Sequence, residues 1–303
     1  MGRRQQTHWQ SCKIWRGHST PTHQAQSRCR LADRIRPCNS AVQAKQGPNM
    51  PRIDLNADLG EGYGPWSMGN DAAMLDLVSS ANIACGGHAG DPDTMFATLQ
   101  LAAARGVIIG AHPGYADPAG FGRRIIPMQP DEISRMVAAQ VGALQGVAAL
   151  AGARVRYVKA HGALANLAAA DRVVADAVAV AVRALPGDLA LLAISGTALE
   201  SAGRAAGLSV FSEIFADRGY LSSGQLVPRS HPAAMIHEPA AAAARLTGFL
   251  ATGRMPVIDG APIALAAQSI CIHGDSPGAV AMAHHLRTSL QGTGTTIAAF
   301  LGS

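Results

Sequence analysis

Residues 53–59 read Ile-Asp-Leu-Asn-Ala-Asp-Leu, and the rest of the sequence is best interpreted outward from this stretch. Side chains two positions apart share one face of a β-strand. A strand here therefore places Asp54, Asn56 and Asp58 on one face and apolar residues on the other. Polar groups on a buried strand must pair with each other, line a cavity or bind a ligand, because unpaired burial costs free energy. We interpret this strand as part of a functional site, although a purely structural polar network has the same pattern.

Short apolar runs alternate with longer helical patterns after this strand. We predict strands at 53–59, 82–85, 107–111, 155–160, 189–194, 209–215 and 269–273. We predict helices at 94–105, 130 to about 150, 171–185, 239–250 and 277–290. This alternation indicates βαβ units and a parallel sheet, either a barrel or a doubly wound open sheet. Polar residues end nearly every strand, as in (β/α) barrels. We therefore predict an α/β fold, a deformed (β/α) barrel of about seven parallel strands.

The basic charge of the chain is concentrated at its amino terminus. Of 25 Lys/Arg and 20 Asp/Glu, residues 1–49 hold nine basic and one acidic residue, which leaves a net charge of −3 for the rest. Residues 1–49 also lack helical or strand periodicity. We predict that they are an unstructured leader, not native to the protein, and that residues 50–303 form a single barrel domain beginning at Met50.

Composition excludes several classes of protein. Aromatic residues do not alternate with basic ones, which argues against nucleic-acid binding. No stretch approaches the roughly 20 apolar residues of a membrane helix, and no secretory signal is present. The sequence contains no P-loop, no GxGxxG after a strand, no GxSxG and no HExxH. These features predict a cytoplasmic protein without a nucleotide site of a familiar kind.

Four predicted strands end in a histidine beside glycine. These histidines are His88, His112, His161 and His273. A single histidine of this kind is usually structural, but four at equivalent strand ends indicate a site, since glycine allows close approach and histidine titrates near neutral pH. Strand parity also aligns Lys159 with His161, and His273 with Asp275.

Lys159 is the only lysine after residue 45. A lysine in the middle of a predicted strand is poorly placed to be a solvated surface charge. We expect it to pair with a buried acid, Asp58 or Glu213, or to bind an anionic group of a substrate.

Weaker candidates lie in loops. The glycine-rich stretch 120–124 presents Arg123 and Arg124, which suit a carboxylate or phosphate, although a solvated loop explains them equally well. In residues 213–218, an arginine follows two acids with which it can pair. The substrate-binding candidates are Asn56, Asn82, Arg123, Arg124, Asp217 and Arg218.

Six motifs in fixed order resemble the LamB/YcsF family. They are residues 54–62 (Asp-Leu-Asn-Ala-Asp-Leu-Gly-Glu-Gly), 82–91 (Asn-Ile-Ala-Cys-Gly-Gly-His-Ala-Gly-Asp), 110–114 with 120–124 (Gly-Ala-His-Pro-Gly and Gly-Phe-Gly-Arg-Arg), 159–164 (Lys-Ala-His-Gly-Ala-Leu), 215–218 (Phe-Ala-Asp-Arg) and 273–275 (His-Gly-Asp). The resemblance covers about 53 to 300. The family pattern usually reads Lys-Pro-His-Gly-Ala-Leu-Tyr-Asn, and here Ala160 replaces the proline and Ala165 the tyrosine.

The resemblance implies a barrel related to the glycoside hydrolase/deacetylase group. It also implies hydrolysis of 5-oxoproline to glutamate coupled to ATP, carried out with partner subunits B and C. Because this sequence lacks a nucleotide motif, we expect the partners to handle ATP and to deliver a phosphorylated oxoproline.

The strand-end residues suggest a mechanism for opening the ring. Asp58 or Glu213 would orient and deprotonate the attacking water. His88 or His112 would assist. The catalytic candidates are Asp58, His88, His112, Lys159, His161, Glu213, His273 and Asp275.

The remaining steps need positive charge and a proton donor. Lys159 and His161 would stabilise the developing oxyanion. A His273–Asp275 pair would protonate the departing ring nitrogen, and an arginine of loop 120–124 would hold the substrate carboxylate.

Two other functions fit the same residues. The first is a self-sufficient amidohydrolase or deacetylase with a divalent metal held by Asp58, His88 and His112. The scheme preferred above needs no metal. The second is a protein that binds substrate for its partners without catalysis.

Overall fold

The computed structural model describes residues 51–276 and 278–302, so the predicted leader lies outside the described residues. Seven parallel strands close into a barrel, because β1 pairs with β2 on one side and with β9 on the other. The barrel strands are β1 (Arg52–Leu59), β2 (Ser80–Ala84), β3 (Ile108–His112), β4 (Val155–Val158), β5 (Ala190–Ile194), β6 (Val210–Phe215) and β9 (Ser269–Ile272). Closure confirms the predicted barrel and excludes the open sheet.

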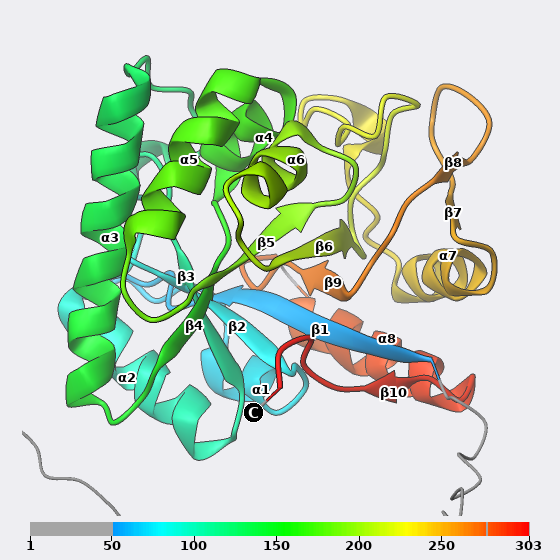
Figure 1. Cartoon of the computed structure of the whole chain (residues 1–303). Coiled ribbons are helices and arrows are strands. Elements are labelled where there is room, and N and C mark those ends of the chain that lie inside the picture. The colour runs from blue at the N-terminus through cyan, green and yellow to red at the C-terminus, as the bar shows by residue number, and fades with distance from the viewer. Residues whose placement is uncertain (1–50, 277, 303) are drawn as a thin grey trace, which may run out of the picture. The chain divides into compact units, whose positions relative to one another are not determined.

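Helices surround the barrel (Figure 1). They are α1 (Asp71–Leu75), α2 (Pro92–Ala104), α3 (Pro130–Leu150), α4 (Gly162–Ala170), α5 (Arg172–Ala184), α6 (Ala198–Ala205), α7 (Pro239–Thr252) and α8 (Ala279–Gly292), with 3₁₀ turns at Pro118–Gly120 and Pro232–Ala234. Three further strands have two residues each. β10 (Thr296–Ile297) runs beside the start of β1, and β7 (Arg254–Met255) forms an antiparallel pair with β8 (Ile263–Ala264).

Several helices differ from the sequence prediction. α2 begins two residues before the predicted start, because Pro92 occupies its first turn and the Asp91 side chain accepts hydrogen bonds from the first backbone N–H groups. The sequence predicted no helix at α1, α4 or α6. The predicted start of the last helix, residue 277, lies outside the described residues.

Helix α3 is, among the described residues, the one helix long and apolar enough by composition to cross a membrane. Its buried residues recur every three or four positions along one face. They are Ile133, Val137, Val141, Leu144 and Ala148. This face packs against the rest of the domain, including α2 and α5. The helix therefore has the pattern of a covering helix of the barrel.

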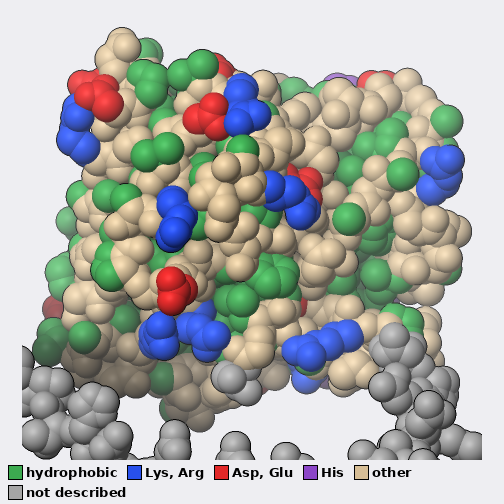
Figure 2. All heavy atoms as spheres, in the orientation of Figure 1, with side chains coloured by type: hydrophobic (Ala, Val, Ile, Leu, Met, Phe, Trp, Pro, Cys, Tyr) green, Lys and Arg blue, Asp and Glu red, His purple; other side chains and the backbone are tan. Residues whose placement is uncertain are grey.

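The surface charge of the described domain agrees with the sequence, in which the excess of basic residues lies in residues 1–49. On the face shown in Figure 2, positive and negative side chains are scattered and form no continuous basic patch. The strongly polar part of the domain is instead the inside of the barrel, where the inward faces of β1, β2 and β6 carry acids and amides.

Candidate active site

The inside of the barrel is arranged in polar layers along β1. Asp54, Asn56 and Asp58 are all buried, and shared hydrogen-bond partners confirm the predicted common face. Asp54 and Asn56 both contact Ser269, and Asn56 and Asp58 both contact Asn82. Asp54 forms the lowest layer, where its carboxylate accepts hydrogen bonds from Ser79 (2.6 Å), Ser80 (2.7 Å) and Ser269. Burial outweighs these donors and raises the pKa of Asp54 to about 6. No positively charged side chain is among the causes of this shift.

The middle layer consists of two amides. Asn82 donates to Asn56 Oδ1 (2.6 Å) and to Asp58 Oδ1 (2.8 Å), and it accepts from the Tyr157 hydroxyl (2.6 Å). Asn56 donates to Ser269 Oγ at 2.7 Å. Both amides were predicted to bind substrate. The structure places them beneath the cavity, where they fix the groups above them.

The upper layer is an ion cluster around Lys159. Its ammonium nitrogen lies 2.9 Å from Asp58 Oδ1, 3.1 Å from Glu213 Oε2 and 3.0 Å from Cys271 Sγ. Lys159 is only 3% exposed. The predicted pairing with a buried acid is therefore confirmed for both Asp58 and Glu213.

The pKa values of the two carboxylates of this cluster are shifted in opposite directions. Burial favours the neutral form of Asp58, but the charges of His112 and Lys159 outweigh it and hold the Asp58 pKa well below its usual value. Burial raises the pKa of Glu213, and Lys159 offsets it only in part. Burial also opposes the charge of Lys159, but Asp58, Cys271 and Glu213 outweigh it and raise the pKa of Lys159 well above its usual value. The cluster thus favours an ionised Asp58 beside a lysine that keeps its charge.

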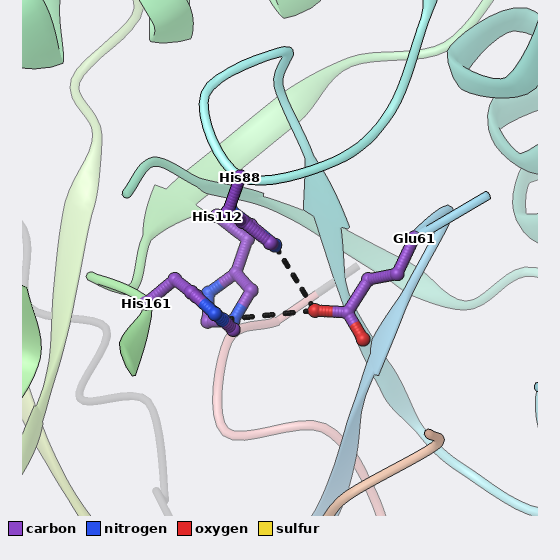
Figure 3. A group of neighbouring side chains, drawn as sticks. All are labelled: Glu61, His88, His112 and His161. Carbon is purple, nitrogen blue, oxygen red and sulfur yellow. Dashed lines mark hydrogen bonds and ion pairs between the residues drawn. The ribbon is translucent and has the colours of Figure 1, made fainter. Parts of the chain in front are cut away.

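Three histidines and a glutamate lie together beside this cluster (Figure 3). His88 Nε2 is 3.0 Å from Glu61 Oε1, and His161 Nδ1 is 3.0 Å from His112 Nε2. The rings of His88 and His161 stack with centroids 3.6 Å apart. One ligand atom from each of the four residues lies within 4.8 Å of the others, a grouping that could hold a metal ion. We call these four residues the histidine cluster.

All four residues of the histidine cluster are buried. Burial lowers the pKa of His88 and of His161 well below the usual value. Burial raises the pKa of Glu61, and the carboxylates of Asp58 and Asp275 raise it further. Gly122 has a positive φ of 62°, and a Cβ there would lie 2.7 Å from that of His88. Glycine at 122 therefore lets the loop pack onto the cluster.

A second group of charges lies at the carboxyl ends of β6 and β9. His273 Nδ1 is 2.8 Å from Asp217 Oδ2, and Arg229 Nη2 is 3.3 Å from His273 Nε2. Arg123 Nη2 is 2.6 Å from Asp275 Oδ2. The predicted His273–Asp275 pair is therefore wrong, because His273 pairs with Asp217 and Asp275 pairs with Arg123. Strand parity does not hold there, because β9 ends at Ile272 and both residues follow it.

Arg218 is buried beside this group. It was predicted to pair with an acid, but its Nη2 donates to Val227 O (2.7 Å) and its Nε to Ala234 O (3.2 Å). Burial, with the nearby charge of Arg229, lowers its pKa to about 10, so it is still a cation at neutral pH.

A cavity of about 270 Å³ opens above the ion cluster at the carboxyl ends of the strands. Its polar wall is formed by groups from both sides of the barrel. They include Asp58, His112, Arg123, Lys159, His161, Glu213, Arg218, Arg229 and His273. Small residues, among them Ala160, Ala163 and Ala165, line another wall. The cavity joins positive charge, an ionised carboxylate and histidines in one space.

Some predicted residues do not reach this cavity. Arg124 has a side chain that is 66% exposed, and it pairs with Asp117. His88 lies behind His161 in the histidine cluster. Asp217 and Asp275 reach the cavity through their partners, His273 and Arg123.

Glu61 was missed by sequence reasoning. Strand parity continued from Asp58 leads to position 60, but Gly60 has a φ of 67°, which turns the chain and ends the alternation. Glu61 is brought inside by that turn and is 5% exposed. The one available signal was an acid between two glycines within the first motif.

The whole domain matches known proteins. A model of the LamB/YcsF family matches residues 53–302. The chain belongs to the LamB/YcsF family. It is 50% identical over 249 residues to the A subunit of 5-oxoprolinase from Nitrobacter hamburgensis, a match that covers 82% of this chain and 98% of that protein. It is 50% identical over 250 residues to the corresponding 5-oxoprolinase chain of Methylococcus capsulatus, covering 82% and 96%.

A solved structure has the same architecture. The crystal structure of the lactam utilization protein from Thermus thermophilus is 42% identical and superimposes with a TM-score of 0.77, covering 82% of this chain and 99% of that one. The resemblance inferred from six motifs is thus confirmed over essentially the full described domain.

Proposed function

We propose that this chain is the A subunit of a 5-oxoprolinase and hydrolyses the lactam of 5-oxoproline to give glutamate. The observation that carries the proposal is identity of about one half over nearly the whole length of relatives that bear this name. The site has the groups that the reaction needs. A lactam is a stable amide, so its opening requires a positioned water, stabilisation of negative charge on oxygen and a proton for the departing nitrogen.

Asp58 is proposed as the general base. Its Oδ1 is held by Lys159 and Asn82, and its Oδ2 lies 3.4 Å from His112 Nε2 at the cavity wall. A carboxylate fixed on one oxygen and presented through the other is suited to orient a water and take its proton. The low pKa of Asp58 keeps its carboxylate ionised and able to accept a proton, but it also makes Asp58 a weaker base than a carboxylate of raised pKa such as Glu213. The assignment therefore rests on the position of Oδ2. Glu213 then serves to hold Lys159.

Lys159 is proposed to stabilise the negative charge that develops on oxygen in the tetrahedral intermediate. It lines the cavity beside Asp58. His161, which the sequence suggested for this role, donates its Nε2–H to Phe121 O and burial lowers its pKa, so it has no hydrogen free for an oxyanion. Lys159 is held by side chains from β1, β6 and β9, so little reorganisation is needed when charge develops.

His273 is proposed to protonate the ring nitrogen as the bond from this nitrogen to the carbonyl carbon breaks. Asp217 accepts the Nδ1–H of His273 and fixes the ring, and Arg229 donates to Nε2 in this structure. His273 can therefore deliver a proton from Nε2 only after Arg229 turns away from it. This replaces the Asp275 pairing expected from the sequence. Asp275 instead orients Arg123, which we propose binds the substrate carboxylate.

ATP and partner subunits belong to the same proposal. The relatives carry the name of one lettered component of 5-oxoprolinase, which supports a complex of several chains. We propose that subunits B and C use ATP to phosphorylate the carbonyl oxygen and that the product reaches this cavity in the cytoplasm. Water then adds to the ring carbon and the C–N bond breaks, which gives an acyl phosphate. A second water hydrolyses the acyl phosphate to glutamate and inorganic phosphate. The methyl group of Ala165, where the family pattern has tyrosine, leaves one edge of the cavity apolar, so preference among substituted lactams is expected to differ there.

The test is glutamate release from 5-oxoproline by the full chain, alone and with subunits B and C, with and without ATP. The proposal expects turnover only with ATP and both partners. Turnover by the chain alone without ATP would instead indicate a self-sufficient amidohydrolase. Substrate binding without turnover in the complete mixture would indicate a chain that only delivers substrate.

A further inference from the structure

Hydrogen-bond acceptors converge in the histidine cluster, and the backbone determines which ring nitrogens these are. His112 Nδ1 lies 2.8 Å from the carbonyl oxygen of Lys159, and His161 Nε2 lies 2.9 Å from that of Phe121. A backbone carbonyl only accepts hydrogen bonds, so each of these ring nitrogens must carry a hydrogen. In the neutral rings the other two nitrogens, His112 Nε2 and His161 Nδ1, are therefore bare acceptors.

These two acceptors face each other at 3.0 Å. Within residues 51–276 and 278–302, their other polar neighbours in this cluster are carboxylates. Glu61 Oε1 lies 3.6 Å from His161 Nδ1, and Asp58 Oδ2 lies 3.4 Å from His112 Nε2. A proton on His112 Nε2 separates it from His161 Nδ1 and Asp58 Oδ2 but leaves Glu61 Oε1 opposed to His161 Nδ1. A single cation at the centre satisfies Glu61, His112 and His161 together and also supplies positive charge beside Asp58.

We propose that Glu61, His112 and His161 bind a divalent transition-metal ion of the zinc class through Glu61 Oε1, His112 Nε2 and His161 Nδ1. Imidazole and carboxylate ligands suit such ions. Tetrahedral ligands about 2.0–2.1 Å from a metal stand about 3.3 Å apart, and the pairs here are separated by 3.0 and 3.6 Å. The inference rests on side-chain geometry and stands whether or not 5-oxoproline is the substrate.

The surroundings have the features of a metal site. Both histidines donate their remaining N–H to a backbone carbonyl, the outer contact that orients metal-bound histidines in proteins. His88 lies 3.0 Å from Glu61 Oε1 and is positioned to orient that carboxylate. His112 and His161 also line the cavity, which provides a path for the ion to enter. The ligand set differs from the Asp58, His88 and His112 set considered from the sequence, since Glu61 and His161 take part.

A bound ion would lie beside Asp58, at the wall where we place the attacking water. There it would act as a Lewis acid and lower the pKa of a bound water. Binding itself, however, is measured without any reaction.

The test uses the full chain after chelation and dialysis, titrated with Zn²⁺ by calorimetry and followed by thermal unfolding. We expect saturable binding that raises Tm. Residues 1–50 contain three His and three Cys of their own, so the stoichiometry does not identify the site. Site-directed variants do. Glu61→Gln and, separately, His161→Gln should weaken binding by more than the roughly 10–100-fold that loss of an outer contact causes.

A matched control is the double variant His284→Ala/His285→Ala, which removes two exposed histidines of α8. It should bind Zn²⁺ as the wild-type chain does. If one of the two site variants fails to fold, Co²⁺ is added to the remaining variant. Its visible absorption then shows whether the low-symmetry site of nitrogen and oxygen ligands is lost. Equal Zn²⁺ affinity in the wild-type chain and both site variants, or no saturable binding, would overturn the proposal.

Discussion

Asp54 and Asp58 lie on the same strand and the same face of it, four residues apart, yet the pKa values of their carboxyl groups are shifted in opposite directions. Asp54 is surrounded by three serine hydroxyls, and burial raises its pKa to about 6. Burial opposes the charge of Asp58 as well, but His112 and Lys159 outweigh it and lower its pKa. Hydroxyl donors therefore offset only part of the effect of burial on a carboxyl pKa, whereas adjacent cations more than offset it. We therefore assign a structural role to the layer of Asp54 and a catalytic role to the layer of Asp58 and Lys159.

The largest expected effect follows from removing the cation of the upper layer. Lys159→Met leaves the carboxylates of Asp58 and Glu213 buried beside each other without the lysine they share, although Asn82 still donates to Asp58 and Asn56 to Glu213. We expect a loss of about 3–5 kcal/mol in the free energy of unfolding, as for other broken buried ion pairs. Urea unfolding at pH 7 measures it. Arg172→Met, which removes an exposed pair with Asp176 within α5, is the control and should change stability by about 0.5 kcal/mol or less. Comparable losses of unfolding free energy in the two variants would show that Lys159 stabilises the fold no more than an exposed ion pair does.

The lower layer predicts a dependence of stability on pH. The pKa of Asp54 is raised from 3.8 to about 6, so the folded state holds this proton more tightly than the unfolded state. The stability it contributes is fully present below pH 3.8 and is lost as pH rises through 6. The shift corresponds to about 3 kcal/mol.

This contribution is measured against a variant. Between pH 4 and 7 the wild-type chain should lose about 2 kcal/mol more stability than Asp54→Asn, measured by urea unfolding at each pH. Parallel curves for the two proteins would show that folding does not raise the pKa of Asp54.

A smaller effect separates the two neighbouring arginines of loop 120–124. Arg123 lines the cavity, and Arg124 is exposed and bonded to Asp117. Arg123→Ala should raise the KM for 5-oxoproline by roughly 10–100-fold, because a charge-assisted hydrogen bond to the carboxylate is lost. Arg124→Ala should leave KM unchanged. An equal rise in both variants would place the substrate carboxylate at the rim rather than inside.

The sequence was sufficient for the fold because each barrel strand is a short apolar run between helical patterns. All seven strands were predicted to within about two residues at each end. The two-residue strands β7, β8 and β10 were not, since so short a pairing leaves no periodicity. Helices α4 and α6 are only nine and eight residues long, and their alanine-rich sequences resemble the apolar runs around them.

The site was predictable only as far as strand parity holds. Parity correctly placed Asp54, Asn56 and Asp58, because β1 continues to Leu59. It did not hold for Lys159 and His161, since β4 ends at Val158 and the two side chains join different clusters. Beyond a strand end, the direction of a side chain depends on turns that the sequence does not determine.

The most direct test of the account compares turnover of Asp58→Asn with that of Asp54→Asn. Each full-length variant is assembled with subunits B and C and supplied with ATP and 5-oxoproline, and thermal unfolding confirms that it folds. We predict that Asp58→Asn lowers kcat by about 10²–10⁴-fold, the usual contribution of a general base, while Asp54→Asn retains activity within a few-fold. Wild-type turnover by Asp58→Asn, or an equal loss in both variants, would contradict the assignment of Asp58 as the base.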